Sequence, residues 1–504
     1  MHGKATSLIQ GASGSVARPA EAVELHWIWA ALGLASLIWF GVSVTSEWVL
    51  PYMLAWVLAM VALVPVARRV SEGRFDPFEP INGICILYVI YFSVATVFDL
   101  NTPDKPGRLD LPFEDTVVKG LLHAILALVA LQGGYALAPR KARPQNDVLR
   151  PPAGNRVFVT ALVVYLIGLT ARLYGVSKGM HIKFASAEIY GQYTGADVFY
   201  DYLGFLSTYG FILMAADGFA SGTWGPRRFI AVAVMLPIEL FFAFLAGPKE
   251  YFIPIVLGPV IMYHYARRRV SIKRAVLPLL VFAFVVFPVM TSYRSIQPAA
   301  IRRLSFWDGV GFGASTVAAE ISSRNMAEYI SWSGHLVAER MDGIYTFSAV
   351  IDNVPRTLDF QWGKTIAVGL AMLVPTFIWQ SKYDYLATVI TWGTEIFGPA
   401  TAGSGGISIT QPGELFLNFG PFGMVLGMIA LGYGIGRLYW WLMGKGFFGV
   451  LILAVLFPAL VIPEYPIAAY YSNAVKQFVI VLLIGWAAGA RTVRARHLNI
   501  SSCP

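Results

Sequence analysis

A series of apolar stretches, each close to the length of a bilayer-crossing helix, dominates this sequence of 504 residues. A helix needs about 20 predominantly apolar residues to cross the hydrocarbon core of a bilayer. The composition agrees, because 57% of the residues are hydrophobic and 13% are charged, whereas soluble proteins carry roughly 25% charged residues. We therefore predict an all-α polytopic membrane protein with about twelve transmembrane helices. The predicted spans are 26–45, 48–67, 81–98, 117–138, 156–174, 199–220, 229–246, 251–266, 275–292, 421–442, 446–463 and 467–489.

Basic residues follow every second predicted span, and this pattern gives the orientation of the chain. Lys and Arg accumulate in the short cytoplasmic loops of membrane proteins. We therefore expect residues 1–25 and 491–504 to be cytoplasmic tails, with no cleaved signal peptide. The net charge of +9 is then a sign of orientation, and we expect no nucleic acid as a partner. The basic residues concerned are Arg68, Arg69, Arg74, Arg140, Lys141, Arg143, Arg150, Arg227, Arg228, Arg267, Arg268, Arg269, Lys273, Arg274, Arg437, Lys445, Arg491, Arg494 and Arg496.

The segment between the ninth and tenth predicted spans, residues 293–420, is too long for a plain connection. It separates spans one to nine (26–292) from spans ten to twelve (421–490). The orientation predicts a large periplasmic loop with short or re-entrant helices of its own. Within it, the stretch 365–379 is apolar but short and contains Pro375. A full crossing there would move the later basic clusters to the outer side, so we expect an interfacial or re-entrant helix.

Polar side chains near the outer side of the predicted bundle form a candidate site. Lysine and arginine suit the oxygens of a phosphate or diphosphate, and carboxylates can act as general bases. The candidates for diphosphate binding are Lys249, Arg294, Arg340, Arg302 and Arg303; those for catalysis are Glu414, Glu250 and Asp342; those for substrate binding are His335, Tyr345, Asn418, Glu464 and Tyr465.

Several of these residues also have a plainer interpretation. Lys249 and Glu250 could solvate a tight turn between two spans. Arg302 and Arg303 could form a pair that contacts lipid headgroups, and His335 could be a satisfied polar residue. The sequence leaves these alternatives open.

Other polar residues are expected to be structural. Asp217 and Glu239 lie within predicted spans, where they suit interhelical hydrogen bonds, and Arg172 near a span end is expected to snorkel to the interface. Cys85 and Cys503 predict no disulfide framework. No motif with metal-ligand spacing occurs, so we expect neither a metal nor another cofactor.

Three motifs carry a resemblance to a known family. They are the turn AGPKEYFIPIVL (246–257), the helix exit SYRS (292–295) followed by the box ERMDGI (339–344), and the stretch SITQPGELFLNFGPFG (408–423). Together with the long late loop, they resemble the bacterial O-antigen and exopolysaccharide repeat-unit polymerases of the Wzy type. Many members carry Arg where this chain has Lys249, which offers a point charge instead of a planar fork.

The resemblance implies an inner-membrane glycosyltransferase of the GT-C type that works on the periplasmic face without a metal. Its donor and acceptor would be oligosaccharides linked to undecaprenyl diphosphate, in contact with membrane lipid, and a chain-length regulator is a candidate partner. A hydroxyl of one repeat unit would displace undecaprenyl diphosphate from the growing chain, with inversion at the anomeric carbon.

Two alternatives stay open at this stage. A ligase would use the same chemistry to move finished glycan onto another acceptor. A polytopic transporter of lipid-linked glycan is the other, although matched halves joined by a cytoplasmic loop would be typical of a transporter and are not visible here.

Overall fold

The computed structural model describes residues 19–101, 113–139, 151, 155–178, 195–222, 224–247, 249–267, 269–270, 280–295, 306–340, 342–374, 378–379, 381, 392–397 and 409–489. Every regular element within these residues is a helix. Helix formation satisfies each backbone N–H and C=O within its own segment, which the interior of a bilayer requires.

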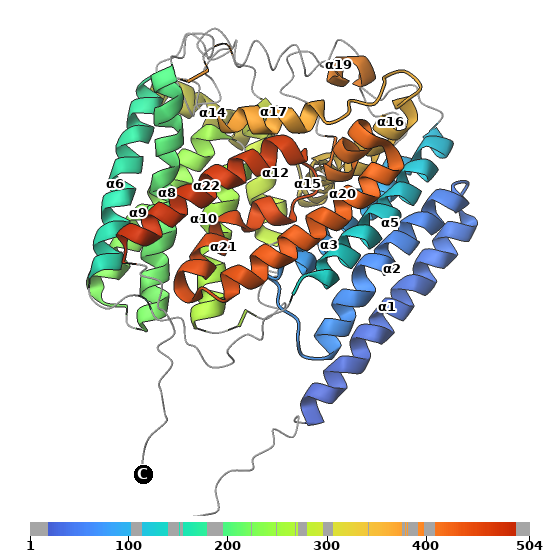
Figure 1. Ribbon diagram of the computed structural model, residues 1–504, viewed down its shortest axis with the longest axis horizontal. Helices are drawn as coiled ribbons and strands as arrows, with labels where there is room; N and C mark the ends of the chain where they lie inside the picture. Colours follow the sequence, from blue (N-terminus) through green and yellow to red (C-terminus); the bar gives the residue numbers. More distant parts are fainter. Residues whose placement is uncertain are drawn as a thin grey trace, which may run out of the picture.

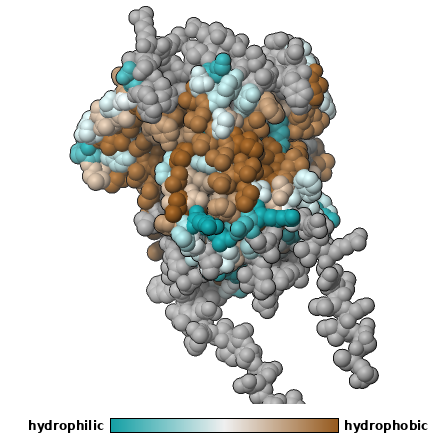
Figure 2. Space-filling view, turned by 90° about the vertical axis from the view of Figure 1, so that its left-hand side faces the viewer, coloured by the Kyte–Doolittle hydropathy of each residue, from teal (hydrophilic) through white to brown (hydrophobic). Residues whose placement is uncertain are grey.

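Seven helical segments of the described chain are long and apolar enough to cross a membrane. They confirm the all-α membrane class and seven of the predicted spans. Figure 2 shows the matching surface, a hydrophobic band across the middle of the molecule with hydrophilic residues below it. The seven are α2 (Val49–Ser71), the continuous run of α3 (Pro80–Tyr88), η1 (Val89–Val94) and α4 (Ala95–Leu100), α5 (Phe113–Leu137), α6 (Arg156–Ser177), α8 (Gly195–Ser221), α9 (Pro226–Ala246) and α20 (Gln411–Met443).

The other five predicted spans coincide with shorter apolar helical stretches. For the prediction at 275–292, residues 275–279 lie outside the described part of the chain, and η2 begins at Phe282. The helices concerned are α1 (Pro19–Thr45), α10 (Lys249–Ala266), η2 (Phe282–Val286) with α12 (Phe287–Ser295), α21 (Gly446–Val461) and α22 (Ile467–Ala487).

The long loop between α12 and α20 contains helices of its own. We call the end of the molecule where α14, α16, α17 and α19 gather in Figure 1 the upper end, and the opposite end, where α20 turns into α21, the lower end. Helix α17 lies across the upper end (Figure 1) and stops at Leu373, before Pro375. The loop helices are α14 (Phe306–Ser322), α15 (Met326–Arg340), α16 (Gly343–Asn353), α17 (Lys364–Leu373) and α19 (Trp392–Phe397).

Helices α5 and α20 approach each other until their backbones touch. A Cβ atom on Gly134 of α5 would lie 2.0 Å from the carbonyl oxygen of Ile429, and one on Gly432 of α20 would lie 2.1 Å from that of Leu131. Small residues permit such close approach between membrane helices, where van der Waals packing replaces the hydrophobic effect as the driving force. The second segment of α20 therefore packs backbone against backbone on α5.

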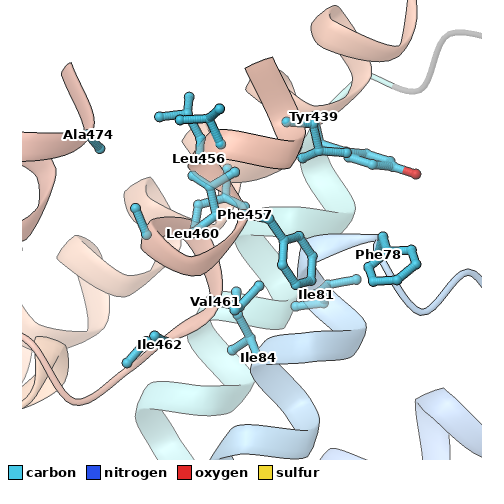
Figure 3. Close-up of a cluster of buried hydrophobic side chains, with 14 of the residues drawn as sticks. Phe78, Ile81, Ile84, Tyr439, Leu456, Phe457, Leu460, Val461, Ile462 and Ala474 are labelled. Atoms are coloured by element: carbon cyan, nitrogen blue, oxygen red, sulfur yellow. The ribbon is translucent and has the colours of Figure 1, made fainter. Parts of the chain in front are cut away.

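Helix α21 is buried along its length and packs on α3 (Figure 3). Phe457 meets Phe78 edge to face, with ring centroids 5.7 Å apart. The absence of a side chain on Gly83 admits Val461, whose Cγ1 would lie 3.0 Å from a Cβ atom there. This layer joins the N-terminal and C-terminal helices into one core.

A buried ion pair joins α6, α8 and α9. Arg172, only 3% exposed, places a guanidinium nitrogen 3.1 Å from the carboxylate of Glu239 and donates to the hydroxyl of Thr208 and to the carbonyl of Gly204. The prediction that Arg172 snorkels to the interface is wrong, because its whole side chain turns inward to neutralise Glu239. The prediction that Glu239 is an interhelical partner is confirmed, as is that for Asp217, which pairs with Arg228 of α9.

We expect Gly134→Ala and Gly432→Ala to destabilise the protein, because each new methyl group would overlap a carbonyl oxygen of the facing helix. Overpacking of this kind costs about 1–3 kcal/mol. The measurement is the thermal unfolding of the purified protein in detergent.

Gly133→Ala and Gly434→Ala are the matched controls, since a Cβ atom on either glycine would meet no neighbour within 4 Å among the described residues. Alanine favours a helix by about 1 kcal/mol over glycine, so these variants should be neutral or slightly more stable. Equal losses in all four variants would contradict the close backbone contact.

Candidate functional site

Helix α20 is broken near the upper end, and its sequence explains the break. Gly420 has φ 66° and ψ −166°, a conformation that glycine adopts without strain. Pro421 follows and has no N–H, so the carbonyl of Leu417 loses its usual partner four residues along. The break divides α20 into a first segment, 411–419, in which every residue except Phe419 is buried, and a longer second segment. The predicted boundary at 420–421 between loop and span falls on this break.

The turn after α16 supplies the hydrogen bonds that the break removes. The N–H of Gln361 donates to the carbonyl of Leu417 at 3.0 Å, and the N–H of Trp362 donates to the carbonyl of Asn418 at 3.0 Å. The side chain of Asn418 adds a third hydrogen bond between the turn and α20, since its Oδ1 accepts from the N–H of Gly363 at 2.8 Å. Buried backbone carbonyls need a hydrogen-bond partner, and here a second segment of backbone supplies the donors.

Glu414 joins three helices at the upper end. Its Oε1 accepts a hydrogen bond from Thr365 of α17 at 2.7 Å, and its Oε2 accepts from the N–H of Ala468 at 3.1 Å. Ala468 lies in the first turn of α22, and Pro466, the N-cap residue before this helix, makes no side-chain capping hydrogen bond. The Glu414 carboxylate therefore acts as the missing cap, where the helix dipole also favours a negative charge.

A strained residue fixes the start of α20. Thr410 has φ 65° and ψ 162°, a region that β-branched residues rarely adopt and that costs of order 1–3 kcal/mol. Its hydroxyl accepts from the N–H of Gly413 at 3.2 Å, and its N–H donates to the carbonyl of Glu464 at 3.1 Å. The side chain of Glu464 accepts from the hydroxyl of Tyr91 at 2.8 Å. These bonds link the turn before α22 to the first segment of α20 and to η1.

We call Thr365, Thr410, Glu414, Asn418 and Glu464, together with Tyr91, the upper polar network. The sequence predicted three of these, Glu414, Asn418 and Glu464, and the structure brings them together. Each of the three is less than one-tenth exposed. Each carboxylate oxygen of Glu414 accepts a hydrogen bond from a protein group, and its role as the catalytic base stays a prediction.

The remaining described candidates lie on other elements. Asp342 caps α16 by accepting from the N–H of Tyr345 at 3.1 Å. His335 of α15 is exposed and meets Phe98 edge to face at 5.2 Å, while Tyr465 is half-buried against the core. Asp342, Tyr345, His335 and Tyr465 therefore stay predictions as site residues.

For three of the five predicted diphosphate-binding residues, the structure describes the backbone position but not the side chain. Lys249 begins α10 and is followed by Glu250, Arg294 lies in the last turn of α12, and Arg340 ends α15. The side chains of these four lie outside the described part, and so do Arg302 and Arg303 altogether. Among the residues that are described, no three His, Cys, Asp or Glu side chains gather as metal ligands.

The sequence did not single out Thr365, Thr410 or Tyr91. Thr365 donates to Glu414 and accepts from the amide of Asn418 at 2.7 Å. A weak signal existed for Thr410, which precedes Gln-Pro-Gly-Glu and so matches the pattern of a helix start with proline in its first turn. No local signal marks Thr365 or Tyr91, because their partners are distant in sequence.

A second polar cluster, centred on Asp76, lies between α2 and α3 at the lower end. Its Oδ2 accepts from the hydroxyls of Tyr265 and Tyr439 at 3.0 Å and 3.4 Å, and its Oδ1 lies 3.4 Å from Nε2 of His264. Burial by itself would raise the pKa of Asp76, but His264, the N–H of Phe78 and Tyr265 together lower this pKa below its usual value. The cluster ties the loop after α2 to α10 and α20.

Comparison with known families finds one match. A family described as "Domain of unknown function (DUF8712)" matches residues 178–434, just over half of the chain. The matched part includes α8 to α12, the loop helices and the broken part of α20. The comparison with curated proteins gave no match, and the comparison with solved structures gave none either.

We expect Glu414→Gln to lower the stability of the protein. A glutamine can accept at one oxygen only, so either Thr365 or the N–H of Ala468 would lose its acceptor inside the protein. An unsatisfied buried donor costs about 1–3 kcal/mol. Thermal unfolding in detergent is the measurement, with the exposed Glu395→Gln as control. Unchanged stability of Glu414→Gln would contradict the capping role.

We expect acid to weaken the lower cluster. Because the pKa of Asp76 is lowered in the folded protein, its charge stabilises the fold above the unfolded pKa, and this contribution is lost as the pH falls through the folded pKa. Asp76→Asn should lower the free energy of unfolding by about 1–3 kcal/mol at neutral pH. The stability of this variant should also fall less than that of the wild-type protein as the pH is lowered. Unfolding temperatures measured from neutral to acidic pH test this, and parallel pH profiles would contradict it.

Proposed function

We propose that this chain, which belongs to the DUF8712 family, polymerises oligosaccharide repeat units linked to undecaprenyl diphosphate. The observation that supports the proposal best is the broken helix α20. The stretch 408–423 resembles the signature of repeat-unit polymerases, and its residues 411–423 form the first segment of α20 and the start of the second. Irregular backbone at membrane depth is tolerated where it is buried or lines a binding cavity, and the buried charge of Glu414 is of the kind that tends to mark functional sites in membranes.

The proposal includes the finer topology. In this proposal the five shorter apolar helical stretches also cross the membrane. With the seven long spans they make twelve crossings, in an arrangement of the GT-C type. With both termini in the cytoplasm, as the basic loops favour, the upper end faces the periplasm of a bacterial inner membrane. The loop helices and the upper polar network then lie on the side where undecaprenyl-linked repeat units are polymerised.

The reaction is a direct displacement. The hydroxyl at the non-reducing end of one lipid-linked unit forms a bond to the anomeric carbon of the growing chain. The bond from that carbon to the diphosphate breaks, and undecaprenyl diphosphate leaves with the electron pair. The hydroxyl proton passes to a carboxylate. Displacement from the opposite face inverts the anomeric configuration.

The residues divide into two groups by role. Lys249, Arg294 and Arg340 stabilise the diphosphate as its charge grows, which is the largest electrostatic demand of the step. Glu250 or Asp342 accepts the proton, because a base must reach the attacking hydroxyl and Asp342 is half-buried. Both oxygens of Glu414 accept hydrogen bonds from protein groups, so we assign it to holding α17, α20 and α22 in register around the site.

We expect Arg340→Ala to lower polymerisation by about 100-fold or more, the usual cost of removing a group that stabilises developing charge. The assay is the length of the glycan made by cells whose chromosomal copy is deleted and replaced by the variant. Deletion itself should leave single repeat units and no long chains.

The control is Arg324→Ala, an arginine of the same loop that stacks on Trp332 at 4.1 Å and should leave chain length unchanged. Membrane levels of both variants are measured alongside. Long chains in the deletion strain would reject the proposal. Long chains that stay on undecaprenyl diphosphate and fail to reach their final acceptor would replace it by the ligase alternative.

A further inference from the structure

Two exposed cations share one buried carboxylate at the upper end. Lys119 of α5 has its Nζ 3.5 Å from Oδ1 of Asp352, and Arg356, in the turn after α16, donates to Oδ2 of the same carboxylate at 2.6 Å. The side chain of Asp352 is 5% exposed, whereas those of Lys119 and Arg356 are 54% and 62% exposed. The carboxylate thus pairs with two cations, one at each oxygen, and the side chain of each cation stays more than half exposed.

The charges of this trio do not cancel. One carboxylate and two cations leave a net charge of +1, and the buried member is the negative one. An isolated surface ion pair contributes little and forms no fixed site. Here a carboxylate that is buried has to stay paired, so it fixes the positions of both cations before any ligand arrives. Two cations that are already held in place lose less conformational entropy when they bind an anion than two freely moving side chains would lose.

The position of the trio indicates which anion is available. Gly120 touches α16, since a Cβ atom there would lie 2.0 Å from the hydroxyl of Ser348, so α16 lies against the first turns of α5. Below Lys119, the same face of α5 presents Leu122 and Leu126, which are 50% and 44% exposed. The spacing of three and seven residues from Lys119 places all three on one side of the helix. A lipid whose acyl chains cover these leucines would present its headgroup at the height of Lys119.

We propose that Lys119 and Arg356, prearranged by Asp352, bind the phosphate of an anionic membrane lipid at the upper end. Arg356 can bind two phosphate oxygens with its planar fork, and Lys119 adds a point charge. The site is separate from the upper polar network, and it holds whether or not the proposed polymerase activity is correct.

The test measures the binding of defined ligands to delipidated protein in a neutral detergent. Phosphatidylglycerol is titrated while thermal unfolding is followed, and native mass spectrometry counts the lipids bound. Diacylglycerol, which lacks a phosphate, is the lipid control, and inorganic phosphate is the soluble control. We expect stabilisation by phosphatidylglycerol at low concentration and none by diacylglycerol.

The variants are Lys119→Gln, Arg356→Gln and the double variant. Charge-assisted hydrogen bonds to phosphate are among the stronger polar contacts, so the half-saturating concentration of phosphatidylglycerol should rise at least about tenfold in the double variant. Arg68→Gln is the matched control, because Arg68 also pairs with an acidic residue four positions away, is 74% exposed and lies at the lower end.

Each result decides the question. For each protein, the rise in unfolding temperature caused by the lipid is compared, and not the unfolding temperature without lipid. A loss of stability caused by the substitutions themselves therefore does not affect the comparison. An equal shift in wild-type protein and in the double variant would overturn the proposal. An equally large shift with inorganic phosphate that is lost in the double variant would overturn the lipid as ligand and assign the cations to a soluble phosphate.

Discussion

The need to satisfy the buried backbone groups freed by the break in α20 governs the upper end of this molecule. Pro421 has no N–H to donate to the carbonyl of Leu417, which accepts from Gln361 instead, and the carbonyl of Asn418 accepts from Trp362. A buried backbone group left unsatisfied costs about 1–3 kcal/mol. The turn at 361–363 therefore has to lie against the break, and the turn positions α17 over α22. Much of the architecture at this end follows from two residues.

Part of this could be predicted from the sequence and part could not. Long apolar stretches indicated the membrane class, and the helices confirm seven spans, because burial in lipid needs nothing beyond a local run of apolar side chains. The stretch 408–423 resembles a family signature, and the structure places its Glu414 and Asn418 in one network. The partners of Glu414 were not predicted. Thr365 and Ala468 are remote in the chain, and only the folded arrangement of three helices brings them together.

The wrong prediction about Arg172 has a physical cause. Its place near a span end suggested a side chain that reaches for water. The structure instead turns it toward Glu239, which would otherwise be an unpaired charge among buried side chains, and an unpaired buried charge costs far more than the loss of a hydrated arginine. Sequence position alone could not reveal that the faces of α6 and α9 meet through α8.

The capping of α22 by Glu414 has a mechanical consequence. The first segment of α20, the start of α22 and helix α17 are joined by hydrogen bonds at several points, and the close contact of α5 with α20 anchors the group from below. A displacement of any one member is carried to the others, so this wall of the molecule moves as a single body. Any opening that admits a bulky ligand at the upper end is therefore expected at elements outside this group of helices.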